Sequence, residues 1–395
     1  MGDKISMNNE RTKYSSLSIV ILISILIYSF MVYTLSSDKS FIDIPHIVVG
    51  IPPYYIALFF LIISFFVYIF IKKKVKIDII CILLFIRIAI HLYTTINIDI
   101  DNGYITNITT DLLCLLIYIY SINYNGSYKD IYNIFIFIFV LICSQTIIES
   151  FLGKYTFFDS IYNYKQDLVI PIGGSNSIAS KIVPIYAFLM CGNYKKKNKI
   201  LLSCLLFITV IITKSRGGII LSFVAIGLPL FFKKDFRYSD FFKILFVIII
   251  LIISFLFFVD KTNIGKKSFS DSNSSIIERF DRWNNDVSLF EKHPIIGNGF
   301  SKEVMEKNPH NFLFSILIRS GLIGIVLFLL IGISFFTNTK QHLNNDVMRG
   351  CYCLIICMLV HGLIENVIFT YICDTILWLF IGLGKSISNK KELER

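Results

Sequence analysis

The chain has 395 residues, of which 55% are hydrophobic and 16% are charged. That little charge cannot cover so much apolar surface in water, so the composition excludes a soluble globular protein and predicts an all-α polytopic membrane protein. The net charge of +11 does not indicate nucleic-acid binding, because the lysine clusters lie at the ends of apolar runs. Cytoplasmic loops of membrane proteins carry their lysines in that position.

Apolar runs long enough to span a bilayer as helices recur along the chain; such a span needs about 20 residues. The first run, 17–35, is followed by many others, so we expect a membrane span there and not a cleaved signal peptide. About twelve transmembrane helices are predicted, at 17–36, 54–71, 76–95, 106–122, 131–151, 177–193, 200–213, 218–232, 242–259, 312–336, 350–369 and 371–387. Since no repeat or linker divides the sequence, residues 1–395 are expected to form a single membrane domain.

The lysines predict the orientation of these spans. Twelve crossings place every lysine cluster on one side together with both termini, and the positive-inside bias makes that side the cytoplasm. The clusters are Lys72–Lys74, Lys195–Lys199, Lys233–Lys234 and the stretch from Lys385 to Arg395. The loops 96–105 and 152–176 then fall on the outer side, as does a polar insert at 260–311.

The insert 260–311 interrupts the apolar sequence with charged, Asn, Ser and Gly residues, which marks a candidate site in a membrane protein. Arg279 and Arg282 lie in it, and an Arg fork matches phosphate oxygens, so these cations suit a diphosphate. Trp283 beside them is either a platform for sugar stacking or an anchor at the membrane interface. Residues 293–299 are typical of a turn that bends the chain back to the membrane.

A tight outer hairpin, Lys214-Ser215-Arg216-Gly217-Gly218, is expected between two predicted spans. Two cations on the outer side run against the positive-inside bias, so they need an explanation. The start of the next helix exposes backbone N–H groups and carries a partial positive charge, which suits an anion such as phosphate. The alternative is a turn in which the Arg is incidental.

His310 and Asn311 stand directly before the apolar run at 312–336. Histidine can accept a proton near neutral pH, so His310 is a candidate general base. Gly321 and Gly324 follow at a spacing that permits close packing between helices.

Several ionisable residues fall inside the predicted spans. Arg87 and His91 share a helix face, and His361 and Glu365 repeat their spacing. Asp111, Glu149 and Asp374 lie near span ends. These groups either pair between helices or snorkel to the interface, or they line a polar cavity.

These motifs together resemble the O-antigen ligase and O-antigen polymerase superfamily of bacterial inner-membrane glycosyltransferases. The ligases carry a His followed by Asn, Ser or Gln, nine residues, and then Gly-x-x-Gly, as His310, Asn311, Gly321 and Gly324 do here. The other similar motifs are the Ser215-Arg216-Gly217 turn, the Arg–Trp stretch from Arg279 to Gly299, and the Gly/Asn motif from Gly173 to Ala179. Many members have Glu two residues before the first Gly, where this chain has Arg319.

The resemblance implies transfer of a glycan from undecaprenyl diphosphate to an acceptor sugar hydroxyl at the periplasmic face of the bacterial inner membrane. The leading function is an O-antigen ligase that joins O-antigen to lipid A–core. The alternative with the same fold is a polymerase that adds repeat units to a growing glycan. A lipid-glycan transporter is a remote alternative, because charge is sparse along the spans and concentrated in the insert.

In this reaction His310 would accept the hydroxyl proton, and Arg216 with Arg279 or Arg282 would neutralise the leaving diphosphate. Lys214, Ser215, Trp283 and Asn311 would bind substrate. The outer loops contain no cluster of carboxylates or histidines, and the diphosphate is already activated. We therefore expect neither a metal, nor ATP, nor another cofactor.

Overall fold

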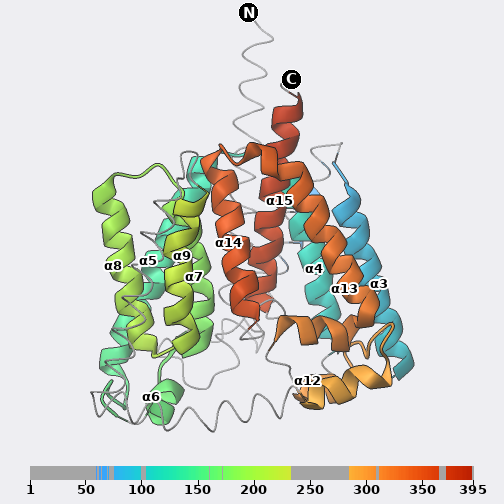
Figure 1. The fold of residues 1–395 in the computed structure, drawn as a ribbon, viewed down its shortest axis with the longest axis horizontal. Coiled ribbons are helices and arrows are strands. Elements are labelled where there is room, and N and C mark those ends of the chain that lie inside the picture. The colour runs from blue at the N-terminus through green and yellow to red at the C-terminus, as the bar shows by residue number, and fades with distance from the viewer. Residues whose placement is uncertain are drawn as a thin grey trace, which may run out of the picture.

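The computed structural model describes residues 75–98, 104–159, 161–170, 172–232, 284–307, 311–363 and 371–393, together with part of 59–70. The protein is mostly helical (Figure 1). The helices are α3 (Ile79–Ile98), α4 (Tyr104–Ile122), α5 (Tyr128–Leu152), α6 (Ile161–Asp167), α7 (Ser175–Met190), α8 (Lys196–Thr213), α9 (Arg216–Phe231), α12 (Lys302–Lys307), α13 (Phe312–Thr339), α14 (Asp346–Gly362) and α15 (Tyr371–Leu393). A 3-10 turn, η2 (Lys340–His342), follows α13, and β1 (Val169–Ile170) pairs with β2 (Gly173–Gly174) in a short antiparallel hairpin.

Each predicted span that falls within these residues is matched by a helix, with ends that differ by a few residues. Within the described residues, three helical runs are long and apolar enough to cross a membrane, namely Ile79–Ile98, Tyr128–Leu152 and Phe312–His342. The predicted spans 17–36 and 242–259 lie outside the described residues, and 54–71 and 350–369 lie partly outside them. The number of twelve spans is therefore not confirmed.

The long helices run side by side as a bundle (Figure 1). In the middle, α14 packs on α7, α9 and α15, and α15 packs on α4. At one side of the bundle α13 packs on α3, and at the other α5 and α8 pack on α7. Helix α7 is buried along almost its whole length, and the Phe188 ring stacks on Tyr132 and meets the edge of Phe380 in the core.

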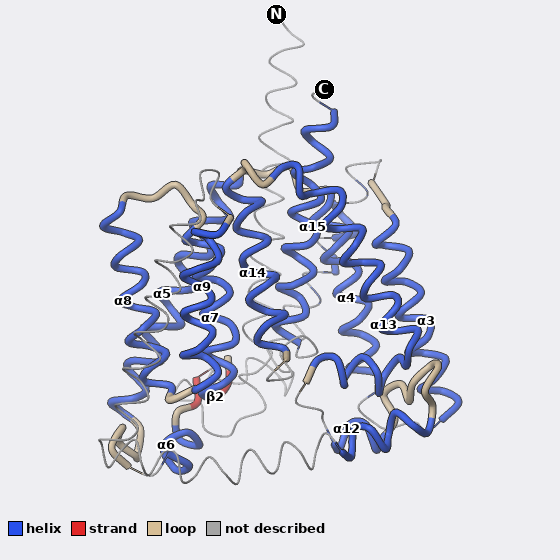
Figure 2. Tube along the Cα trace, viewed as in Figure 1, coloured by secondary structure: helices blue, strands red, loops and turns tan. Residues whose placement is uncertain are grey.

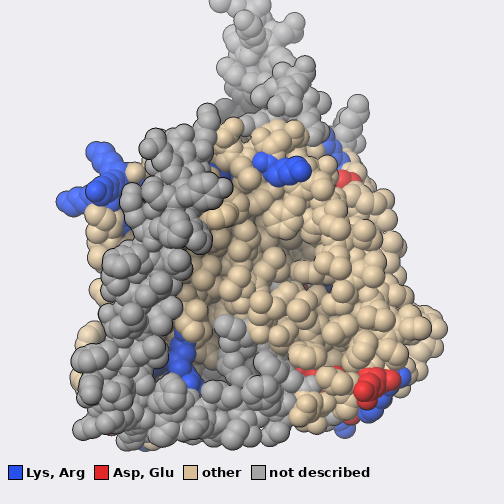
Figure 3. Space-filling view, viewed as in Figure 1, with Lys and Arg blue, Asp and Glu red and all other residues tan. Residues whose placement is uncertain are grey.

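One end of the bundle is held together by contacts between loops and the last turns of helices. Asn123 accepts a hydrogen bond from the Lys76 backbone at 2.9 Å, and Ser386 donates to the Tyr124 carbonyl at 3.0 Å. The lysine cluster at 195–199 and the end of α15 lie at this same end (Figure 1). On the face shown in Figure 3, charged side chains gather towards the two ends, and the wide band between them is almost wholly uncharged.

The opposite end carries the hairpin β1–β2, α6, the turn at 214–215, α12 and the start of α13 (Figures 1 and 2). The segments predicted to face opposite sides of the membrane thus lie at opposite ends of the bundle. Lys72–Lys74 and Lys233–Lys234 lie outside the described residues. Which end is cytoplasmic stays a prediction from the positive-inside bias.

The predicted insert is not a simple loop over its described part. Residues 284–292 and α12 are helical, and Leu289 and Val304 form a small apolar cluster with Ile318 of α13. Burying these side chains ties the second half of the insert to α13.

Candidate functional site

The predicted outer hairpin is a tight turn that starts α9. Lys214 ends α8 in the left-handed conformation, with φ 50°. Ser215 is buried, and its Oγ accepts a hydrogen bond from the Gly218 N–H at 3.2 Å, so it acts as the N-cap of α9. Arg216 is the first residue of the helix, and its side chain is exposed. The structure therefore places one predicted cation at a helix N-terminus and uses the predicted substrate-binding Ser215 to build that terminus.

Lys214, also predicted to bind substrate, is held by aromatic rings. Its Nζ lies 4.6 Å from the ring centroids of both Phe157 and Tyr164, which is cation–π distance, and donates to the Asp159 carbonyl at 3.5 Å. Partial burial lowers the pKa of Lys214, and the charge of Asp159 opposes that shift. These contacts keep the ammonium of Lys214 beside the segment 157–164.

A second helix N-terminus lies beside that of α9. Helices α7 and α9 both start at this end of the bundle, and a Cβ on Gly218 would stand 2.6 Å from the Cβ of Ala179. Glycine at 218 thus lets the two helices touch within one turn of their starts. Ser175, the first residue of α7, is buried, and its Oγ has no hydrogen-bond partner among the described residues.

Lys181 is a further cation in this region that sequence reasoning missed. It is 3% exposed, and its Nζ donates to the Ile172 carbonyl at 2.5 Å, which holds the hairpin over the start of α7. A lysine inside a predicted span was the available signal, because a charge in a membrane helix is rare without a role.

Asn311 begins α13 and anchors it. Its Oδ1 accepts from the Leu313 N–H at 2.8 Å, and its Nδ2 donates to the Leu363 carbonyl at the end of α14, at 2.9 Å. The residue predicted to bind substrate therefore fixes the head of α13 against α14. His310, its neighbour in the chain, lies outside the described residues, as do Arg279, Arg282 and Trp283.

Helix α13 is broken at the first glycine of the family motif. Gly321 has φ 61° and ψ −158°, a conformation essentially restricted to glycine. The sequence predicted that Gly321 and Gly324 let two helices pack closely. That is wrong for Gly321, because the atoms nearest to a Cβ there would be the backbone of Ile295, in a loop.

The loop 293–300 fills the break and replaces the missing helical hydrogen bonds. Backbone groups of the loop pair with those on either side of Gly321. The bonds run from the N–H of Asn298 to Ile318 O (2.6 Å), of Gly299 to Arg319 O (3.0 Å), of Leu322 to Pro294 O (2.9 Å) and of Ile323 to Ile295 O (3.2 Å). The predicted turn at 293–299 thus does return to the membrane domain, where it packs into the break between the two halves of α13.

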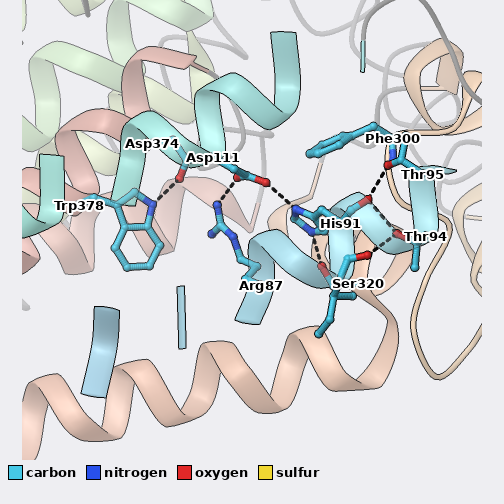
Figure 4. A network of polar contacts seen from close by, with 10 residues as sticks. Arg87, His91, Thr94, Thr95, Asp111, Phe300, Ser320, Asp374 and Trp378 are labelled. Atoms are coloured by element: carbon cyan, nitrogen blue, oxygen red, sulfur yellow. Dashed lines mark hydrogen bonds and ion pairs between the residues drawn. The ribbon is translucent and has the colours of Figure 1, made fainter. Parts of the chain in front are cut away.

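A chain of buried polar groups connects this break to two other helices (Figure 4). Arg87 Nη2 lies 2.5 Å from one oxygen of Asp111, and His91 Nδ1 lies 2.6 Å from the other. His91 Nε2 contacts Ser320 Oγ, the residue before the break, at 2.5 Å. For Arg87, His91 and Asp111, the structure shows the first of the two predicted alternatives, pairing between helices.

The network continues on both sides. The guanidinium of Arg87 lies over the ring of Trp378, whose Nε1 donates to Asp374 at 3.1 Å. Beside His91, the ring of Phe300 makes an edge contact at 4.9 Å, and the guanidinium of Arg319 lies 5.4 Å from that ring. Arg319, which stands where the family often has Glu, is 5% exposed and packs against the docked loop.

No group of three or more His, Cys, Asp or Glu residues within the described ranges has the arrangement needed to hold a metal ion.

A family model described as O-antigen ligase matches residues 201–329 of this chain. The matched segment contains the turn at Ser215–Arg216, the docked loop and the break in α13, so it confirms the resemblance drawn from these motifs. No curated protein matches the chain at a significant level.

Proposed function

We propose that this chain is a glycosyltransferase that acts on a glycan linked to undecaprenyl diphosphate, because a family model described as O-antigen ligase matches residues 201–329. The acceptor is the lipid A–core, and the site faces the periplasm from the bacterial inner membrane, with both termini in the cytoplasm. The observation that carries the proposal is that the Arg216 turn and the head of α13 lie at the same end of the bundle. Helix α14 joins them, because it packs on α9 and its last turn holds Asn311.

The proposed reaction follows from the groups at the Arg216 turn and at the head of α13. The oxygen of an acceptor hydroxyl attacks the anomeric carbon, the bond from that carbon to the phosphate oxygen breaks, and undecaprenyl diphosphate leaves. Arg216, at the N-terminus of α9, supports the charge that grows on the leaving group, aided by Arg279 or Arg282. His310 takes the hydroxyl proton, and Asn311 keeps the head of α13 in place beside it.

The ligase reaction is preferred to polymerisation because the matching family is described as O-antigen ligase. The two activities leave different products in a deletion strain. Loss of a ligase leaves bare core and free lipid-linked polysaccharide, whereas loss of a polymerase leaves core that carries a single repeat unit.

Complementation of a deletion strain tests the role of Arg216. We expect Arg216→Ala to lower transfer about 10²–10³-fold, as loss of one transition-state donor does elsewhere. Arg216→Lys should restore little, because a point charge cannot form the two parallel bonds of a guanidinium. Arg349→Ala is the matched control, since Arg349 pairs with Asp346 at the opposite end of the bundle. Normal lipopolysaccharide from a well-expressed Arg216→Ala variant would refute the site.

A further inference from the structure

We propose that Ser320, held by His91 and Asp111, is a positioning residue that sets the first half of α13 for glycosyl transfer. The inference rests on the proposed function. It assigns to the buried network a task beyond pairing charge, namely to fix the direction of residues 312–320 and hence the place of Asn311 at their head.

The first step is that the break at Gly321 separates the first half of α13, residues 312–320, from the rest of the helix. This half-helix can tilt as one rigid piece and is called the lever below. At Gly321 the backbone leaves the helical conformation, and the groups freed on either side bond to the loop 293–300. Such groups are costly in a membrane unless they are paired, so loop and half-helix are held as one unit.

The second step is that this unit is attached to α3 on two sides. Gly299 lies so close to α3 that a Cβ there would stand 2.7 Å from the backbone nitrogen of Thr95, and the Phe300 N–H donates to Thr95 Oγ1 at 3.0 Å. These contacts hold the loop. The contact of Ser320 Oγ with His91 Nε2 holds the half-helix itself (Figure 4).

The third step is the length of the lever. At a rise of about 1.5 Å per residue, Asn311 lies roughly 13 Å along the helix from Ser320. A tilt of about 5° at the break would therefore move the head of α13 by about 1 Å. A misplacement of that size costs about 100-fold in rate when it affects a group aligned with the reacting atoms.

The order of groups, Asp111 to His91 to Ser320, is also the order that activates a serine nucleophile in hydrolases. Here the serine is 3% exposed and sits inside the bundle between α3 and α13. A nucleophile must reach its substrate, so the burial of Ser320 favours a positioning role. The same chain of bonds, anchored by Arg87 on the far oxygen of Asp111, gives His91 one orientation.

Substitutions of His91 separate its two bonds. The amide of Gln reaches the position of Nε2 and can still bond Ser320, whereas the shorter amide of Asn reaches the position of Nδ1 and can bond only Asp111. If Ser320 is the residue that must be held, His91→Gln will keep a higher kcat than His91→Asn. If the network only satisfies the Asp111 carboxylate, the order will be reversed.

The assay uses the full-length protein in proteoliposomes with a lipid-linked glycan donor. We expect Ser320→Ala to lower kcat by about 100-fold with the donor KM unchanged, because the donor site at α9 is untouched. Thr339→Val is the control. It removes a buried hydrogen bond between α13 and Tyr352 of α14 at the far end of the same helix, so it should keep the wild-type kcat.

Hydrogen exchange supplies a readout that does not depend on activity. Ser320→Ala should speed exchange of the Asn298 and Gly299 amides, which bond to the half-helix, more than Thr339→Val does. Wild-type kcat in Ser320→Ala, an equal loss in Thr339→Val, or a kcat of His91→Asn at or above that of His91→Gln would overturn the proposal. Inactivity of the wild-type protein would count against the proposed function, and the exchange rates would still decide whether Ser320 holds the lever.

Discussion

Gly321→Ala tests whether the break in α13 is required for the fold. The residue has φ 61° and ψ −158°, and holding a side chain in this region costs about 1–3 kcal/mol. The new methyl group would also overlap the carbonyl of Ile295, a backbone group that cannot rotate away. Overpacking against a fixed neighbour adds about 1–3 kcal/mol. We therefore expect a loss of about 2–6 kcal/mol in the free energy of unfolding.

Gly332→Ala is the matched control on the same helix, because a Cβ at Gly332 would meet nothing within 4 Å. In a helix interior this change stabilises by up to about 1 kcal/mol. Thermal unfolding in detergent should place the midpoint of Gly321→Ala several degrees below that of the wild type and Gly332→Ala at or above it. Equal midpoints for the two variants would show that the docking of loop 293–300 into the break does not occur.

Three other predictions address the network, the base and the topology. Asp111→Asn should destabilise the protein by about 3–5 kcal/mol in unfolding assays, because it leaves the buried Arg87 without its carboxylate, and a stability equal to wild type would contradict the pairing. His310→Gln should leave under about a tenth of the transfer rate with donor binding kept, and the wild-type rate should fall in acid, since a protonated imidazole cannot accept a proton. Cysteines introduced at Ser272 and Lys196 should be labelled from opposite sides of the membrane, and labelling of both from outside would refute the topology.

The helices of the bundle were predictable from sequence because each is built from a continuous apolar run. Composition alone marks α3, α5 and α13. The polar N-caps Ser127 and Asn345 start α5 and α14 a few residues before the predicted starts at 131 and 350, which followed the apolar runs and not the caps. The small elements at the outer end were not predicted. Helix α6 and the hairpin at 169–174 lie in a segment interpreted as a loop, since their few residues gain stability from tertiary contacts and not from a local pattern.

The candidate site was predictable in part. The turn at Ser215–Arg216 follows from local residue types, which is why it was predicted. Asn311 was predicted to bind substrate, and its role as the N-cap of α13 was not predicted. The spacing of Arg87 and His91 showed a shared helix face, but their partner Asp111 and the contact with Ser320 join residues up to 229 positions apart. A single sequence does not show which residues so far apart come into contact. It does not show the positive φ of Gly321 either.

The broken helix and the buried network both serve to keep a loop paired and fixed inside the membrane domain. A helix that stops inside the apolar region exposes backbone groups, and a loop that enters it needs partners for its own. The backbone groups of the loop 293–300 and of the break at Gly321 pair with each other, which holds the loop and the half-helix together. The contacts of His91 with Ser320 and of Thr95 with Phe300 attach this unit to α3. Arg87 and Asp111 hold His91 in one orientation, so they fix the point at which α3 holds the half-helix. This role accounts for two buried charged residues at this place in a chain with little charge.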